Sequence, residues 1–127
     1  MENMLKALTT DKAPAAIGPY SQAIQWENLI FTSGQIPADP KTGKIVEGGI
    51  TAQAEQVMKN ISFILEAAGS SMDQAVKTTC FLASMEDFAE FNQVYEKYFP
   101  GKPARSCVAV KSLPKHTLCE VEVIAVI

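Results

Sequence analysis

The sequence predicts an α+β fold in which two helices cover one face of a mixed β-sheet. Three observations favour this class: two stretches with apolar residues at helical spacing, a strand between them, and two β-branched-rich strands at the C-terminus. The 127 residues suffice for a single domain, residues 1–127, that buries most of its unfolded surface. A composition of 47% hydrophobic and 20% charged residues is typical of a folded soluble protein.

The N-terminal part of the chain predicts short strands and a hairpin. Residues 1–19 contain two prolines and a glycine, which favours a loop or a weak edge strand. Strand-like runs follow at residues 23–26 and 29–33, with the turn Glu27-Asn28 between them. Residues 37–49 are rich in turn-forming types, so we expect the tip of a hairpin there.

Two helices are predicted from their apolar periodicity. The first ends at Gly69, which supplies a left-handed stop, and its apolar face consists of Ile50, Ala54, Val57, Met58, Ile61, Leu65 and Ala68. The second covers residues 84–99, where Ser84 and Asp87 resemble a capping box, and Pro100-Gly101 ends it. Residues 75–83 form a strand between the helices. The element order is therefore β-β-α-β-α-β-β.

Right-handed crossovers would place both helices on one face of the sheet and leave the other face bare. In the two C-terminal strands, the uniformly apolar positions, which include Val108 and Val121, suit the helix side. We therefore expect a mixed apolar and charged set on the bare face: Arg105, Cys107, Ala109, Leu118, Glu120, Glu122 and Ile124. This mixture is typical of a wet subunit interface, which predicts an oligomer.

Composition excludes several classes of protein. The net charge is −3 and no run of lysine and arginine occurs, which argues against binding a nucleic-acid backbone. The N-terminus has no apolar signal segment, and no stretch approaches the ~20 apolar residues of a membrane span. Three cysteines without C-x-x-C spacing and one histidine make a disulfide framework or a zinc site unfavourable. A reduced, cytoplasmic, metal-free protein is expected.

Arg105 and Glu120 are the residues best suited to chemistry. A guanidinium binds a carboxylate through two parallel hydrogen bonds, so Arg105 could anchor a small acid. The alternative is a structural ion pair with Glu120 or Glu122, and the pattern does not choose between them. Glu120 in a partly dry pocket could orient a water molecule or accept its proton, with a pKa raised by desolvation. Its alternative is an interface salt bridge.

Other polar residues are weaker candidates. A Cys107 nucleophile would need the loop that carries His116 to fold back, so the Cys107 backbone beside Arg105 is the more useful group. Gly34 follows a strand, where glycine permits close backbone approach to a ligand. The further residues that could line a pocket are Ser33, Tyr20 and Asn92.

Four segments of the chain carry a family resemblance: GPYSQAI at residues 18–24, TSGQIP at residues 32–37, PARSCVAVKSLP at residues 103–114 and LCEVEVIA at residues 118–125. Together they resemble the RidA family of reactive intermediate deaminases. The resemblance implies a chorismate-mutase-like fold and a homotrimer with its sites between subunits. It implies hydrolysis of 2-iminobutanoate and 2-iminopropanoate, released by pyridoxal-phosphate enzymes, to 2-keto acids and ammonia without a cofactor.

The resemblance also implies a role for each candidate residue. Arg105 would grip the substrate carboxylate and Glu120 would position or activate water. The remaining contacts would come from the Cys107 backbone, from Ser33 and Gly34 at the reacting end, and from Tyr20 and Asn92 along the cleft. Two rival functions remain: non-catalytic binding of small carboxylates such as 2-keto acids, which would use the same arginine, and RNA cleavage. The acidic balance of the chain argues against RNA cleavage.

Overall fold

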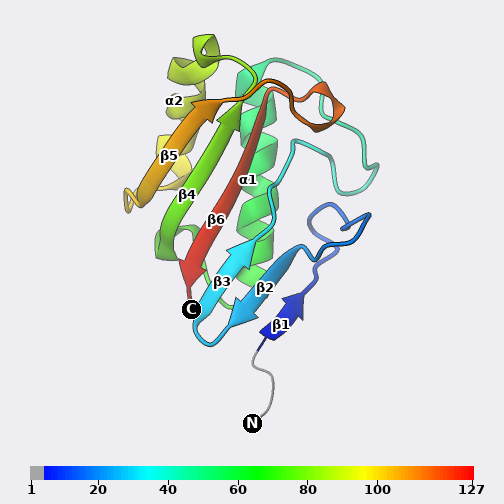
Figure 1. Ribbon diagram of the computed structural model, residues 1–127, viewed down its shortest axis with the longest axis vertical. Coiled ribbons are helices and arrows are strands. Elements are labelled where there is room, and N and C mark those ends of the chain that lie inside the picture. The colour runs from blue at the N-terminus through cyan, green and yellow to red at the C-terminus, as the bar shows by residue number, and fades with distance from the viewer. Residues whose placement is uncertain (1–4) are drawn as a thin grey trace.

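The computed structural model describes residues 5–127 and contains one mixed sheet of six strands. The strands are β1 (Leu5–Leu8), β2 (Ala23–Trp26), β3 (Leu29–Thr32), β4 (Ala75–Leu82), β5 (Ala104–Ala109) and β6 (Cys119–Val126). Their order across the sheet is β1-β2-β3-β6-β4-β5, so β1 and β5 are the edges (Figure 1). All neighbours are antiparallel except β4 and β5, which are parallel. The predicted α+β class is confirmed.

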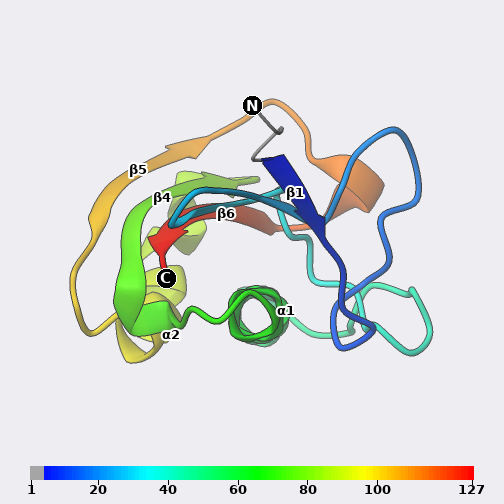
Figure 2. The same cartoon turned by 90° about the horizontal axis from the view of Figure 1, so that it is seen from below.

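Both helices cover the same face of this sheet, as the crossover rule predicts (Figure 2). They are α1 (Ile50–Ala67) and α2 (Phe88–Tyr98), and 3-10 turns lie at Met72–Gln74, Met85–Asp87 and Pro114–His116. Gly69 has φ +82°, so it provides the expected left-handed stop after α1. The Ser84 hydroxyl accepts a hydrogen bond from the Glu86 N–H at 3.1 Å, which caps the turn that leads into α2.

The hydrophobic core lies between the two helices and the sheet. Side chains from α1, such as Val57 and Ile61, are fully buried against Ile30 of β3 and Val121 of β6. Each fully buried side chain of this size contributes about 1.5–3 kcal/mol to stability. Cys80 and Cys119 belong to the same cluster as small core residues. Burial raises the pKa of both thiols to about 12, so both stay protonated.

Strand β6 has the predicted orientation. Its helix-facing residues are buried, and they are Cys119, Val121, Val123 and Ala125. Glu120, Glu122 and Ile124 alternate with them and lie on the open face, the side of the sheet that no helix covers. Ile124 lies opposite Phe31 of β3, whose side chain is 38% exposed. The open face therefore mixes apolar and acidic side chains, as expected.

Strand β5 has the opposite orientation to the predicted one. Arg105 and Cys107 face the helices, not the bare face, and Val108 lies on the open face with 46% of its surface exposed. The parallel register explains this, because Arg105 pairs with Thr78 and Cys107 with Cys80. Both β4 partners point into the helix-side core and have no exposed surface. The prediction was wrong because it assumed that the apolar residues of β5 face the helices. In this edge strand the apolar Val108 lies on the open face instead.

Candidate active site

The predicted site residues fall into two groups on opposite faces of the sheet. The arginine group, on the helix side, consists of Arg105, Cys107 and Asn92. The glutamate group consists of Glu120 on the open face, Gly34 beneath it, and the neighbouring Ser33 and Tyr20. Each group is assembled within one chain, but the sheet separates the two groups.

The arginine group is built on one stripe of α2. The Arg105 Nη1 donates a hydrogen bond to the Asn92 Oδ1 at 2.6 Å. The guanidinium lies 4.6 Å from the ring centroid of Tyr95 and 5.5 Å from that of Phe88. Positions 88, 92 and 95 share one helical face, so a polar Asn92 between two aromatic rings is the sequence signal for this cradle.

Among the described residues, no acidic side chain forms an ion pair with Arg105. Across residues 5–127, the guanidinium makes no ion pair, and the salt bridge found there joins Lys97 to Glu55 at 2.7 Å. Glu120 and Glu122 lie on the other side of the sheet. The alternative of an ion pair between Arg105 and either glutamate is therefore wrong within one chain.

The Cys107 backbone faces the outer edge of the sheet. Val110 donates its N–H to the Leu82 carbonyl of β4 at 2.9 Å, so every second residue of β5 points its backbone groups inward. Cys107 alternates with these residues, and its N–H and C=O therefore point outward beside Arg105. Burial raises the pKa of its thiol, which argues against a thiolate nucleophile.

Glu120 is a half-buried carboxylate packed over the backbone of Gly34. A Cβ atom added to Gly34 would overlap the carboxylate and lie 2.9 Å from its Cδ. This contact arises because Gln35 pairs with Val121, where the Gln35 N–H donates to the Val121 carbonyl at 2.8 Å. Burial raises the pKa of Glu120, and the negative charge of Glu122 raises it further. Its pKa therefore lies above the usual range for a glutamate.

A cleft of about 540 Å³ adjoins the glutamate group. Gly34 and Tyr20 both line it, and Pro114 and Lys115 line it as well. Tyr20 is 53% exposed, so its ring lies at the surface of this cleft. The space exceeds what a three- or four-carbon acid fills.

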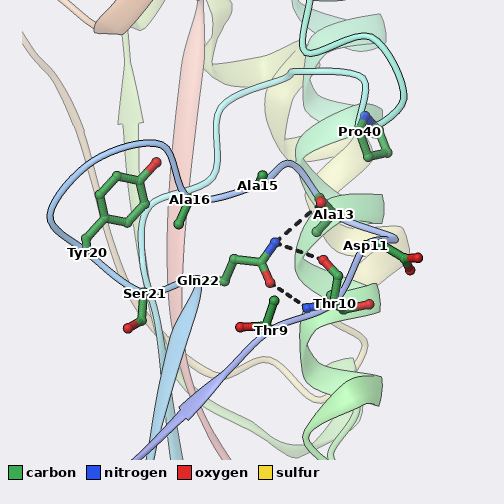
Figure 3. Close-up of a pocket in the computed structure, with 10 residues that line it drawn as sticks. All are labelled: Thr9, Thr10, Asp11, Ala13, Ala15, Ala16, Tyr20, Ser21, Gln22 and Pro40. Atoms are coloured by element: carbon green, nitrogen blue, oxygen red, sulfur yellow. Dashed lines mark hydrogen bonds between the residues drawn. The ribbon is translucent and has the colours of Figure 1, made fainter.

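Gln22 and Ser33 fix the loop that carries Tyr20. Gln22 is 3% exposed, and its side-chain oxygen accepts from the Thr10 N–H at 2.7 Å (Figure 3). Its side-chain nitrogen donates to the Pro14 carbonyl at 2.7 Å. The Ser33 hydroxyl donates to the Ser21 carbonyl at 2.6 Å, so it can interact with a ligand by accepting a hydrogen bond. The sequence analysis missed Gln22, although it lies inside the segment GPYSQAI.

No group of three or more His, Cys, Asp or Glu side chains is placed to hold a metal ion within the described part of the chain. No helix among residues 5–127 is both long and apolar enough to span a membrane.

Comparison with known proteins connects this arrangement to a family. A family model described as Endoribonuclease L-PSP matches residues 10–127. A RutC family protein of Pyrococcus horikoshii is 53% identical over 123 residues, which cover 96% of this chain and 98% of that protein. The 2-iminobutanoate/2-iminopropanoate deaminase of Mus musculus is 48% identical over 122 residues, which cover 95% of this chain and 90% of that protein.

A solved structure agrees in fold as well as in sequence. The crystal structure of E. coli TdcF with bound serine has a TM-score of 0.91 and 42% identity, covering 96% of this chain and 98% of that one. The motifs, the mixed sheet and the full-length similarity lead to one conclusion. The chain belongs to the RidA (YjgF) family, whose family model is described as Endoribonuclease L-PSP.

Proposed function

We propose that this protein hydrolyses 2-imino acids, with 2-iminobutanoate and 2-iminopropanoate as substrates, to 2-keto acids and ammonia. The observation that carries the proposal is the half-buried Glu120 carboxylate, held against Gly34 with a raised pKa. The name of the mouse relative, at 48% identity, supports the same reaction. No cofactor is needed, because a protonated imine carbon is already electrophilic.

The reaction requires orientation and one mobile proton. Glu120 orients a water molecule and accepts its proton as the oxygen attacks C2 of the imine, which forms a tetrahedral carbinolamine. The proton then passes to the nitrogen, the C–N bond breaks, and ammonia leaves as the hydroxyl oxygen loses its proton to become the carbonyl of the keto acid. Arg105 binds the carboxylate, which fixes C2 beside the water.

We place the complete site between two chains of a homotrimer. Arg105 and Glu120 lie on opposite faces of the sheet, so a small acid cannot touch both in one chain. The open face, which carries Glu120 among apolar side chains, suits contact with a second copy. Arg105 and the outward backbone of Cys107, at the β5 edge of that copy, would then reach the glutamate group.

Five residues have supporting roles in this proposal. Asn92 holds the Arg105 guanidinium through its hydrogen bond, and the Cys107 backbone contacts the carboxylate end of the substrate. Ser33 and Gly34 lie beside the reacting end, while Tyr20 lines the cleft. The serine bound in E. coli TdcF, itself a small amino acid with a carboxylate, supports a site for ligands of this class.

A coupled assay tests the proposal. An amino-acid oxidase generates the imine, semicarbazide traps what escapes hydrolysis, and the protein should lower the yield of trapped product. Arg105→Ala should abolish this effect by raising KM more than about tenfold. Glu120→Gln should lower turnover by about 100-fold yet still bind 2-oxobutanoate. Folded Arg105→Ala and Glu120→Gln variants that both act like wild type would refute the proposal.

The rival function is non-catalytic binding of a small carboxylate. The arginine group favours it, because a guanidinium already cradled by α2 can bind an acid without Glu120. The same assay separates the two functions. Tight binding of 2-oxobutanoate together with no effect on the imine would select the binder.

A further inference from the structure

We infer that Tyr95 and Thr78 are positioning residues that hold Arg105 ready for the substrate carboxylate. This inference rests on the proposed function, because it concerns how the same site acquires its affinity. The Tyr95 ring lies under the guanidinium with its centroid 4.6 Å away. The Tyr95 and Thr78 hydroxyls share a hydrogen bond of 2.8 Å.

These contacts form a closed circuit across three elements. Arg105 of β5 lies beside Thr78 of β4 in the parallel register. The Thr78 hydroxyl holds Tyr95 of α2, and the Tyr95 ring returns to the Arg105 guanidinium. Thr78 has no exposed surface and Tyr95 is 8% exposed, so water does not compete for their hydrogen bond. The circuit ties a side chain of the sheet edge to the interior of the protein.

The circuit matters because an arginine side chain is flexible when it is free. Ordering such a side chain costs rotamer entropy, which opposes binding. A guanidinium stacked on Tyr95 and bonded to Asn92 has already lost that freedom before the ligand arrives. The Phe88 ring, 5.5 Å from the guanidinium, contributes a second wall. The two rings leave the edge of the guanidinium to meet a carboxylate.

Substitutions distinguish the contribution of the Tyr95 ring from that of the hydrogen bond between Tyr95 and Thr78. Tyr95→Leu removes the ring, and we expect the Kd for 2-oxobutanoate and the KM for the imine to rise about tenfold, with kcat within about threefold of wild type. Tyr95→Phe and Thr78→Val each remove only the hydroxyl bond, and each should weaken binding about threefold. The double variant should be no weaker than either single variant, because both remove the same bond.

Two controls distinguish positioning from a general loss of stability. Val94→Ala, at a buried position of the same helix, should lower the melting temperature without changing Kd or KM. The Arg105 Nε–H resonance gives a readout that is independent of activity. It should shift in Tyr95→Leu, where the ring current is lost, and stay in place in Val94→Ala.

The outcomes separate this inference from the function that it assumes. If Arg105→Ala abolishes 2-oxobutanoate binding while Tyr95→Leu keeps wild-type Kd, KM and Nε–H resonance, the positioning role is refuted and the proposed function stands. If Tyr95→Phe and Thr78→Val both fold and their effects on Kd add in the double variant, the circuit is refuted. If Arg105→Ala itself binds 2-oxobutanoate and acts on the imine like wild type, both proposals fail.

Discussion

Arg105 and Glu120 lie on opposite faces of one sheet, although only β4 separates the strands that carry them. Arg105 stacks on Tyr95 of α2, whereas Glu120 covers Gly34 on the face that no helix covers. Two groups so placed cannot bind the same four-carbon acid within one chain. Under the proposed function, each chain therefore carries two half-sites.

Gly34→Ala should damage catalysis more than stability. The new Cβ would overlap the Glu120 carboxylate, so that side chain must move away from its place over the Gly34 backbone. Because a displacement of about 1 Å can lower a rate 100-fold, we expect kcat to fall by at least about tenfold. Gly49→Ala is the matched control, since a Cβ there meets no atom within 4 Å. Equal activity of the two variants in the coupled assay would contradict the proposed role of this contact.

The pH dependence of kcat/KM should respond to Glu122. Burial raises the pKa of Glu120, and the like charge of Glu122 adds to it, so activity should fall with decreasing pH at a midpoint above the usual range for glutamate. Glu122→Gln removes the like charge, so the pKa of Glu120 falls and the acid limb of the kcat/KM profile moves to lower pH. Glu66→Gln, an exposed charge change on α1, should leave the limb where it is. A limb that shifts equally in both variants would exclude Glu120 as the titrating base.

Cys107→Ala should retain turnover within about threefold of wild type. Burial raises the pKa of the thiol, so it stays protonated at neutral pH, and the proposal uses only the Cys107 backbone. Steady-state kinetics of Cys107→Ala and Cys107→Ser measure this directly. A 100-fold loss of turnover in both folded variants would contradict this and indicate that Cys107 acts as a nucleophile.

Local patterns were sufficient to predict most of the fold. Helix α1 was expected at residues 50–68 and runs Ile50–Ala67; the strand expected at residues 75–83 runs Ala75–Leu82. Apolar periodicity and a glycine stop are properties of neighbouring residues, so a single sequence displays them. The second helix was expected from residue 84, but the α-helix begins at Phe88 after a 3-10 turn. Such terminal turns are hard to read from sequence.

The faces of β5 could not be predicted, because they depend on a partner distant in the sequence. Val108 is apolar yet exposed, while Arg105 is charged yet packed between aromatic rings of α2. Only the register with β4 decides which of them faces the helices. The contact between Gly34 and Glu120 has the same origin in the pairing of β6 with the segment after β3. The residues of the candidate site were proposed from the sequence, but their division between two faces of the sheet was not.

A complementation experiment tests the central claim, that each site takes Arg105 from one chain and Glu120 from another. Inactive Arg105→Ala and Glu120→Gln chains are unfolded together at equal concentration and refolded as a mixture, beside each variant refolded alone. In a cyclic trimer, about one quarter of the interfaces then unite an intact arginine with an intact glutamate, so we predict about a quarter of wild-type activity. A mixture that forms mixed oligomers and yet stays as inactive as its components would contradict the claim.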